Sequence, residues 1–182
     1  MTSLELRWTT QLTDNDYADM ARLFDSEYAH VHGPWNPKDG YGYASGELHS
    51  LARVDGDLVG YAAAARRFVG VGTGEVVVLG IGGVVTAAPA RGQGIGRQVI
   101  ASLQGAMQSS ARADFGLLGC RPEVVPFYQS CGFSLIEAVI RDVSPGDAKT
   151  VVESDGPTLV CSGTRPVEAW PQGIVDLRGL PW

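Results

Sequence analysis

The chain has 182 residues and a formal net charge of −6, with 14 basic and 20 acidic side chains. This length suits one domain with a sizeable core. An acidic chain is a poor partner for nucleic acid, because neutralisation of phosphates drives that binding. No run of 18 apolar residues is present, which predicts no membrane span, and residues 1–4 lack the basic and apolar regions of a signal peptide.

The charge is unevenly distributed along the chain. Residues 61–136 carry six arginines and three acids, whereas residues 1–60 carry ten acids and four bases, and residues 137–182 carry seven acids and four bases. This distribution suits a central segment that binds an anionic cofactor between segments that attract a cation. A solubilising acidic surface would give the same pattern.

The first predicted element is a short strand over residues 4–8, where apolar and polar residues alternate. Asp14 is expected to cap a helix through about residue 29, and residues 30–46, rich in glycine, proline and aromatics, form a long loop or broken helix. Residues 48–54 and 58–65 form a hairpin around the Asp55-Gly56-Asp57 turn, and residues 68–74 form the next turn region. The apolar face of the helix is formed by Tyr17, Met20, Ala21, Phe24 and Tyr28.

The second half alternates strands and helices. A β-branched run predicts a strand over residues 76–85, and Ile95, Val99, Leu103 and Met107 repeat at helical spacing. A buried strand is then predicted over residues 115–120, followed by a short helix with Pro122 in its first turn. Two further strands are predicted over residues 133–143 and 158–162, with a loop over residues 144–150 between them. The chain ends in a tail rich in proline and tryptophan. Residues 1–182 therefore form one α/β (α+β) domain, with a mixed central sheet of about seven strands and helices on both faces.

A glycine-rich turn joins the strand over 76–85 to the helix that follows it. Its sequence is Arg91-Gly92-Gln93-Gly94-Ile95-Gly96-Arg97. Unpaired N–H groups and the helix dipole favour an anion at such a junction, and glycines let the backbone approach it closely. A nucleoside-triphosphate loop would need Lys-Ser/Thr, and a dinucleotide fold an acid about 20 residues on; neither is present.

Two blocks together resemble the GCN5-related N-acetyltransferases. The first is Arg91-x-x-Gly94-x-Gly96 after a strand, similar to that family's acyl-coenzyme A pyrophosphate motif, and the second runs from Pro126 through Tyr128 to Gly132-Phe133. The resemblance implies that fold, with acetyl-CoA as co-substrate and no metal. The cofactor-binding residues it implies are Val84, Val85, Thr86, Arg91, Gly92, Gln93, Gly94, Ile95, Gly96 and Arg97.

Tyr128 stands where the family places its general acid. A phenol of pKa ~10 can protonate a departing thiolate at neutral pH, while backbone N–H groups around Val84–Thr86 can polarise the thioester carbonyl. A core aromatic is the alternative interpretation of Tyr128. The strand before the turn has no acid where some relatives carry a glutamate, so Glu123 and His49 are the candidates for the base, which stays unassigned.

The whole chain is also similar to the aminoglycoside 2'-N-acetyltransferases, with a Leu48-His49 strand, an acidic turn at residues 153–156 and an ending with Asp176 and Trp182. This resemblance implies an aminoglycoside-type amino-sugar as acceptor, and hence antibiotic resistance, with kasugamycin as one candidate. Carboxylates, including the terminal one of Trp182, and aromatic faces would hold the cationic sugar. The implied substrate residues are Trp35, Asp39, Glu123, Glu153, Asp155, Asp176 and Trp182, with Tyr41 and Tyr43 as further aromatic faces.

Other segments resemble the nodulation-factor N-acyltransferases, namely residues 66–72 and 168–173. Those enzymes also acylate an amino-sugar nitrogen and are expected to use long acyl donors. Two further functions stay open, a non-catalytic acyl-CoA-binding module and a peptide N-acetyltransferase.

Cys120, Cys131 and Cys161 have no metal-binding spacing, so we expect reduced thiols in a cytoplasmic protein, with a nucleophilic Cys120 as the weaker interpretation. The expected partner is a small amino-sugar rather than nucleic acid or membrane, and a monomer and a homodimer both stay open.

Overall fold

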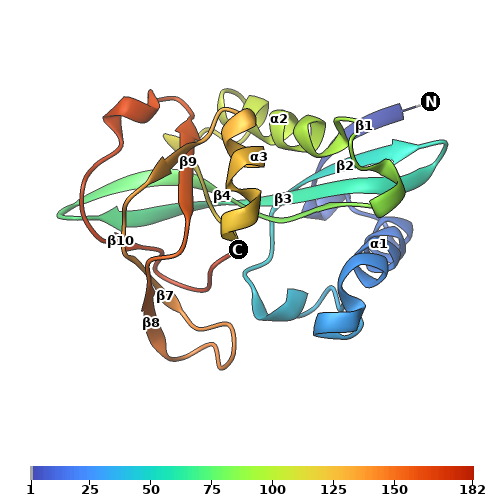
Figure 1. Ribbon diagram of the computed structural model, residues 1–182, viewed down its shortest axis with the longest axis horizontal. Coiled ribbons are helices and arrows are strands. Elements are labelled where there is room, and N and C mark those ends of the chain that lie inside the picture. The colour runs from blue at the N-terminus through green and yellow to red at the C-terminus, as the bar shows by residue number, and fades with distance from the viewer. Residues whose placement is uncertain (1) are drawn as a thin grey trace.

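A single mixed sheet forms the centre of the molecule, with helices on both of its faces (Figure 1). The computed structural model describes residues 2–182. The strand order is β6-β9-β5-β4-β3-β10-β7-β8, and β2 and β1 extend the sheet from β3. The strands are β1 (Thr2–Trp8), β2 (Leu48–Val54), β3 (Asp57–Val71), β4 (Gly74–Thr86), β5 (Phe115–Gly119), β6 (Ser134–Ile136), β7 (Ile140–Val143), β8 (Val151–Ser154), β9 (Thr158–Ser162) and β10 (Val175–Asp176).

Within residues 2–182, three α-helices cover the sheet: α1 (Asp14–His32), α2 (Ile95–Met107) and α3 (Val125–Ser130). Five short 3₁₀ segments connect the elements: η1 (Thr9–Gln11), η2 (Gly40–Gly42), η3 (Ala88–Ala90), η4 (Pro122–Val124) and η5 (Val167–Ala169). None of the helices in residues 2–182 is long and apolar enough to cross a membrane.

The first helix begins one residue earlier than the sequence suggested. Thr13, not Asp14, is the N-cap: its hydroxyl accepts from the Asp16 N–H at 3.3 Å, and the Asp16 carboxylate accepts from the Thr13 N–H at 2.8 Å. This reciprocal capping box satisfies two N–H groups at once, which a cap by Asp14 would not do. The helix also continues past residue 29, to His32.

The long hairpin β3–β4 replaces the turn expected over residues 68–74. Val69 and Val71 are buried while Phe68 is exposed, so the alternation of a strand persists to residue 71. The actual turn is confined to Gly72 and Thr73, where Gly72 has a φ of 57°. The predicted hairpin of β2 and β3 is confirmed, with a register that pairs Leu51 with Tyr61.

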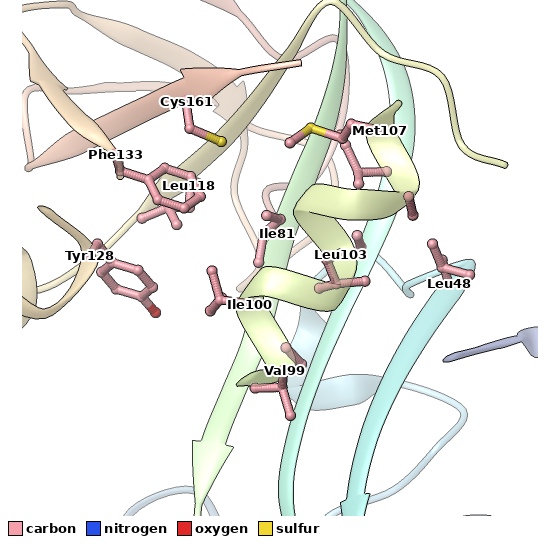
Figure 2. Packing of buried hydrophobic residues seen from close by; sticks show 14 of the residues in the cluster. Leu48, Ile81, Val99, Ile100, Leu103, Met107, Leu118, Tyr128, Phe133 and Cys161 are labelled. Carbon is pink, nitrogen blue, oxygen red and sulfur yellow. The ribbon is translucent and has the colours of Figure 1, made fainter. Parts of the chain in front are cut away.

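Two apolar layers hold the helices on the sheet. On one face α2 and α3 cover a cluster that includes Ile100, Leu103, Leu118 and Tyr128 (Figure 2). On the other face α1 packs Met20, Leu23 and Phe24 against Leu51 and Tyr61. The predicted placement of helices on both faces is therefore confirmed.

The C-terminal third contains more strands than the sequence indicated. The segment predicted as one strand over residues 133–143 divides into β6, which pairs with β9, and β7, which lies between β8 and β10. The expected acidic turn at residues 153–156 begins as strand β8, and the tail contributes β10. The short strands raise the number of strands in the described part of the chain to ten. No local pattern predicted them, because their hydrogen-bond partners come from distant segments.

Candidate active site

The turn between β4 and α2 offers backbone donors to an anion. Gly92 and Gly94 have φ angles of 75° and 79°, in the left-handed region that glycine adopts without steric cost. Gly94 is the N-cap of α2 and provides no side-chain cap, and the N–H groups of Gly96 and Arg97 donate to no acceptor within residues 2–182. Such N–H groups at the positive end of a helix fit a pyrophosphate.

Gly96 keeps this helix end open. A Cβ atom at this position would lie 3.2 Å from the Phe127 ring and 3.3 Å from the Thr86 Oγ1. Both distances are tighter than ordinary van der Waals contact, so a side chain at this position would force Phe127 or Thr86 to shift. Glycine fits at position 96 because α2, α3 and β4 approach one another closely there.

The two arginines of the turn already have protein partners. Arg91 forms an ion pair with Glu27 of α1 and donates from Nε to the Thr86 carbonyl at 3.2 Å. Arg97 donates to the carbonyl of Ser130, at the end of α3, at 2.5 Å. Binding of phosphates by these guanidinium groups therefore stays a prediction.

Glu27 supports the turn from α1, a role that the sequence did not suggest. Its second carboxylate oxygen accepts from the Ala88 N–H at 2.8 Å. The carboxylate thus bridges α1 to both ends of the segment from Ala88 to Arg91. No local pattern distinguishes Glu27 from the other acids of α1, because the contact spans 61 residues of chain.

Strand β4 leaves its neighbour β5 halfway along its length. The two strands pair in parallel from Val78 to Gly80 only, after which β4 continues to Thr86 without β5 beside it. In the same region the register against β3 shifts, so that Gly82 faces Ala63 but Val85 faces Tyr61. A bulge of this kind redirects the backbone, and polar groups along this edge are available to an extended ligand.

One large cavity, with a volume of about 1420 Å³, lies along this open edge. It is lined by the turn, by Val84–Thr86 and by Tyr128, so the structure brings the two sequence blocks together at one site. Of the predicted cofactor residues, Gln93 alone is not among those lining the cavity; its side-chain amide donates to the Pro89 carbonyl at 3.1 Å.

Tyr128 lines the cavity and packs among aromatic rings. Its ring contacts Phe127 and Phe133 edge to face, with centroids 5.0 and 6.0 Å away, and only 8% of the residue is exposed. The hydroxyl points away from Phe133 and Leu118 (Figure 2) and makes no hydrogen bond with the described residues. Burial raises the pKa of this phenol, so the hydroxyl keeps its proton at neutral pH.

The aromatic residues predicted for the acceptor do line the cavity. Trp35 stacks on Phe24 at 5.2 Å with an interplanar angle of 9°. The Trp182 indole lies over Gly80, donates to the Leu117 carbonyl at 3.2 Å, and has the Arg67 guanidinium 4.6 Å from its ring. Trp182 therefore occupies the point where β4 and β5 separate.

The predicted acceptor acids lie elsewhere. Glu153 accepts from Arg141 at 2.7 and 3.0 Å, and Asp176 lines a separate, smaller cavity together with Arg141 and Arg178. Arg141 pairs in register with both acids, which places all three on the face of the sheet away from the large cavity. The remaining acids, Asp39, Glu123 and Asp155, are exposed and also absent from the lining, so a role for these five acids stays a prediction.

His49, one of the candidate bases, is fully engaged. Its Nδ1 lies 2.7 Å from the Tyr61 hydroxyl and its Nε2 lies 2.9 Å from Thr9 Oγ1. Burial lowers the pKa of His49 to about 4, so the ring is neutral at pH 7. With both ring nitrogens bonded, His49 acts first as a buried link between strands β2 and β3.

Asp142 of β7 was not predicted as a site residue from the sequence. It is only 9% exposed, it lines the large cavity, and burial raises the pKa of its carboxyl group. Residues two apart on a strand share a face, so the alternation groups Asp142 with the apolar Ile140, but it does not show which face meets the cavity. That choice follows from the pairing of β7 with β8 and β10.

Cys120 also borders the cavity, but its environment does not activate it. Burial raises the pKa of the Cys120 thiol, whereas a nucleophilic cysteine needs a lowered pKa. Cys120, Cys131 and Cys161 are all free thiols.

Comparison with known proteins places this geometry in a family. The family model of nodulation protein A (NodA) matches residues 2–180. No curated protein matches the chain.

Solved structures share the fold at low sequence identity. A GNAT family N-acetyltransferase (YhbS) from Escherichia coli, in complex with CoA, has a TM-score of 0.63 at 17% identity, covering 97% of this chain and 91% of that one. The ribosomal-protein-S18-alanine N-acetyltransferase from Escherichia coli has a TM-score of 0.60 at 15% identity, covering 93% and 99%. An acyl-CoA N-acyltransferase from Pseudomonas aeruginosa has a TM-score of 0.55 at 22% identity, covering 88% and 97%. These similarities confirm the predicted fold of the GCN5-related N-acetyltransferases.

Proposed function

This chain belongs to the nodulation protein A (NodA) family, since the family model spans nearly all of it, and we propose that it transfers an acyl group from acyl-CoA to an amino-sugar nitrogen. The observation that carries the proposal is the unpaired Tyr128 hydroxyl in the same cavity as the glycine-rich turn. The Tyr128 hydroxyl can protonate a leaving group, and the glycine-rich turn can bind the anionic end of the donor.

The donor side of the mechanism rests on backbone groups. An acyl-CoA thioester supplies the activated acyl group. The N–H groups of Gly96 and Arg97 bind its pyrophosphate, and backbone N–H groups of Val84–Thr86, beside the bulge between Gly82 and Val85, polarise the thioester carbonyl. The remaining predicted turn residues, from Arg91 to Ile95, shape this cradle, and the mechanism uses no metal.

The chemical step exchanges one bond for another. The acceptor nitrogen forms a bond to the thioester carbon while the carbon–sulfur bond breaks. The acceptor attacks as the neutral amine, after its ammonium form has released a proton to solvent. Tyr128 donates its proton to the departing sulfur, and the nitrogen then passes one proton to the resulting tyrosinate, which restores the phenol. Burial raises the pKa of Tyr128, so the phenol is protonated at neutral pH and is the proton donor in this step.

An amino-sugar fits the acceptor side of the cavity. Trp35 and Tyr41 pack around Phe24 at one wall, and Trp182 lies at another, so flat apolar faces are available for a sugar ring. A few polar groups among aromatic walls are typical of small-molecule sites. Family membership favours a nodulation-type N-acyltransferase, and an aminoglycoside, including kasugamycin, is the second acceptor to test.

A thiol-release assay tests the proposal directly. We would combine acetyl-CoA, and separately longer acyl-CoAs, with glucosamine, kasugamycin, kanamycin and a peptide with a free N-terminus. Release of CoA with an amino-sugar is the expected result. Tight CoA binding without turnover of any acceptor would indicate an acyl-CoA-binding module, and turnover of the peptide alone would indicate a peptide N-acetyltransferase.

A further inference from the structure

The cavity contains a carboxylate without a protein partner. Asp142 is 9% exposed, and its side chain makes no hydrogen bond or ion pair with any residue that the structure describes. The residue is largely withdrawn from solvent, while its carboxylate oxygens are accessible from the cavity, and proteins normally pair a partly desolvated charge or use it. Asp142 is therefore a group whose partner should come from outside the chain.

The alternation of β7 explains why Asp142 is unpaired. Ile140 and Asp142 point to the large cavity, whereas Arg141 between them points to the opposite face and binds Glu153. The residue across the ladder from Asp142 is Val152, which offers no side-chain donor. Arg141, the basic residue nearest to Asp142 in the sequence, therefore lies on the other face of the same strand and is paired with Glu153.

The C-terminal tail brings β7 close to the point where β4 and β5 separate. The Val143 N–H donates to the Gly179 carbonyl at 2.9 Å, and the chain then continues to Trp182 over Gly80. In Figure 1 the β7–β8 hairpin and α1 both lie below the long β3–β4 hairpin. Asp142 consequently belongs to the acceptor wall of the cavity, beyond the turn that serves the donor.

We infer that Asp142 binds an ammonium group of the acceptor and selects amino-sugars over neutral sugars. This inference rests on the proposed function and adds the residue that recognises the amine. The carboxylate accepts charge-assisted hydrogen bonds from an ammonium group, which are stronger than those from a hydroxyl group. Acylation converts an amine to a neutral amide, so the same carboxylate favours the substrate over the product.

The test compares Asp142→Asn with a matched control on the same hairpin. Asp147→Asn removes the same charge from the exposed loop between β7 and β8, where Asp147 caps Thr150 and does not line the cavity. Asp142→Asn is expected to raise the KM for glucosamine about 10- to 100-fold, as for loss of one hydrogen bond to a charged group, and to leave the Kd for acetyl-CoA unchanged. Asp147→Asn is expected to change neither value.

Calorimetry with glucosamine and N-acetylglucosamine separates this inference from the proposed function. The wild type should bind glucosamine more tightly than the neutral N-acetyl compound, and Asp142→Asn should remove that preference. If the wild type turns over glucosamine but Asp142→Asn keeps its KM and its preference, the inference is overturned and the function stands. If no acceptor is turned over but the preference is lost in the variant, the function fails and the inference stands. Absence of any glucosamine binding by the wild type would overturn the inference.

Discussion

The two sides of the cavity are built in different ways. The proposed donor side comes from consecutive elements, β4, the turn, α2 and α3, all within residues 74–130, and the groups it offers to a ligand are mainly backbone N–H groups. The proposed acceptor side combines residues as distant as Trp35, Asp142 and Trp182, and it offers side chains. Backbone contacts tolerate most substitutions except at glycine, whereas side-chain contacts can change with the acceptor while the fold stays the same.

Gly96→Asp should give the largest effect, because it places bulk and negative charge among the donor contacts. Loss of two charge-assisted hydrogen bonds to the phosphates predicts a rise in the Kd for acetyl-CoA on the order of 10³-fold, measured by calorimetry. Gly105→Asp is the matched control, since a side chain at Gly105 of α2 meets no atom within 4 Å. Folded Gly96→Asp protein that binds acetyl-CoA normally would remove the turn from the donor side.

His49 should make stability depend on pH. Its folded pKa of about 4 lies below the ordinary value of 6.5, so the unfolded chain binds the proton more readily. The stabilising contribution is present above pH 6.5 and is lost as the pH falls toward 4, in total about 3 kcal/mol. The difference between the free energies of unfolding at pH 7 and at pH 4.5, obtained from denaturant titrations, measures this contribution.

A double comparison assigns this pH effect to His49. His49→Asn should flatten the dependence between pH 6.5 and 4, and His30→Asn, at the exposed end of α1, should leave it unchanged. An equal slope in all three proteins would show that other groups cause it.

Tyr128→Phe tests the group placed between the two sides. The ring contacts with Phe127 and Phe133 remain, so the melting temperature and the Kd for acetyl-CoA should stay close to wild type. Loss of one general acid should lower kcat by about 10²-fold, measured by thiol release. A full rate with chemistry limiting would leave Tyr128 as a packing residue.

The smallest effect should come from the contact between Gly80 and Trp182. A Cβ at Gly80 would lie 2.0 Å from the indole, so Gly80→Ala must displace the ring, at a cost of about 1–3 kcal/mol. In a Trp182→Ala background the same substitution should cost much less, because the conflicting ring is absent. Thermal unfolding of the four proteins gives the coupling, and simple additivity would show that Trp182 does not occupy this point in solution.

The donor side shows how much the sequence could predict. The hydrophobic period changes from that of a strand to that of a helix around the Arg91–Arg97 turn, and the glycines indicate where backbone N–H groups are free. The fold, the helices on both faces and the position of the glycine-rich turn could therefore be predicted. These features are local, because a turn, a cap and a helical face are specified by residues within a few positions of one another.

The acceptor side depended on pairings that no local pattern contains. The division of residues 133–143 into β6 and β7 followed from their separate partners, β9 and β10, which lie far along the chain. That division placed Asp142 in the cavity and Arg141 with Glu153 and Asp176 on the other face. Adjacent residues of a strand point to opposite faces of the sheet, which the sequence alone shows. Which of the two faces meets the cavity depends on the register and partners of the strand, and these exist only in the tertiary structure.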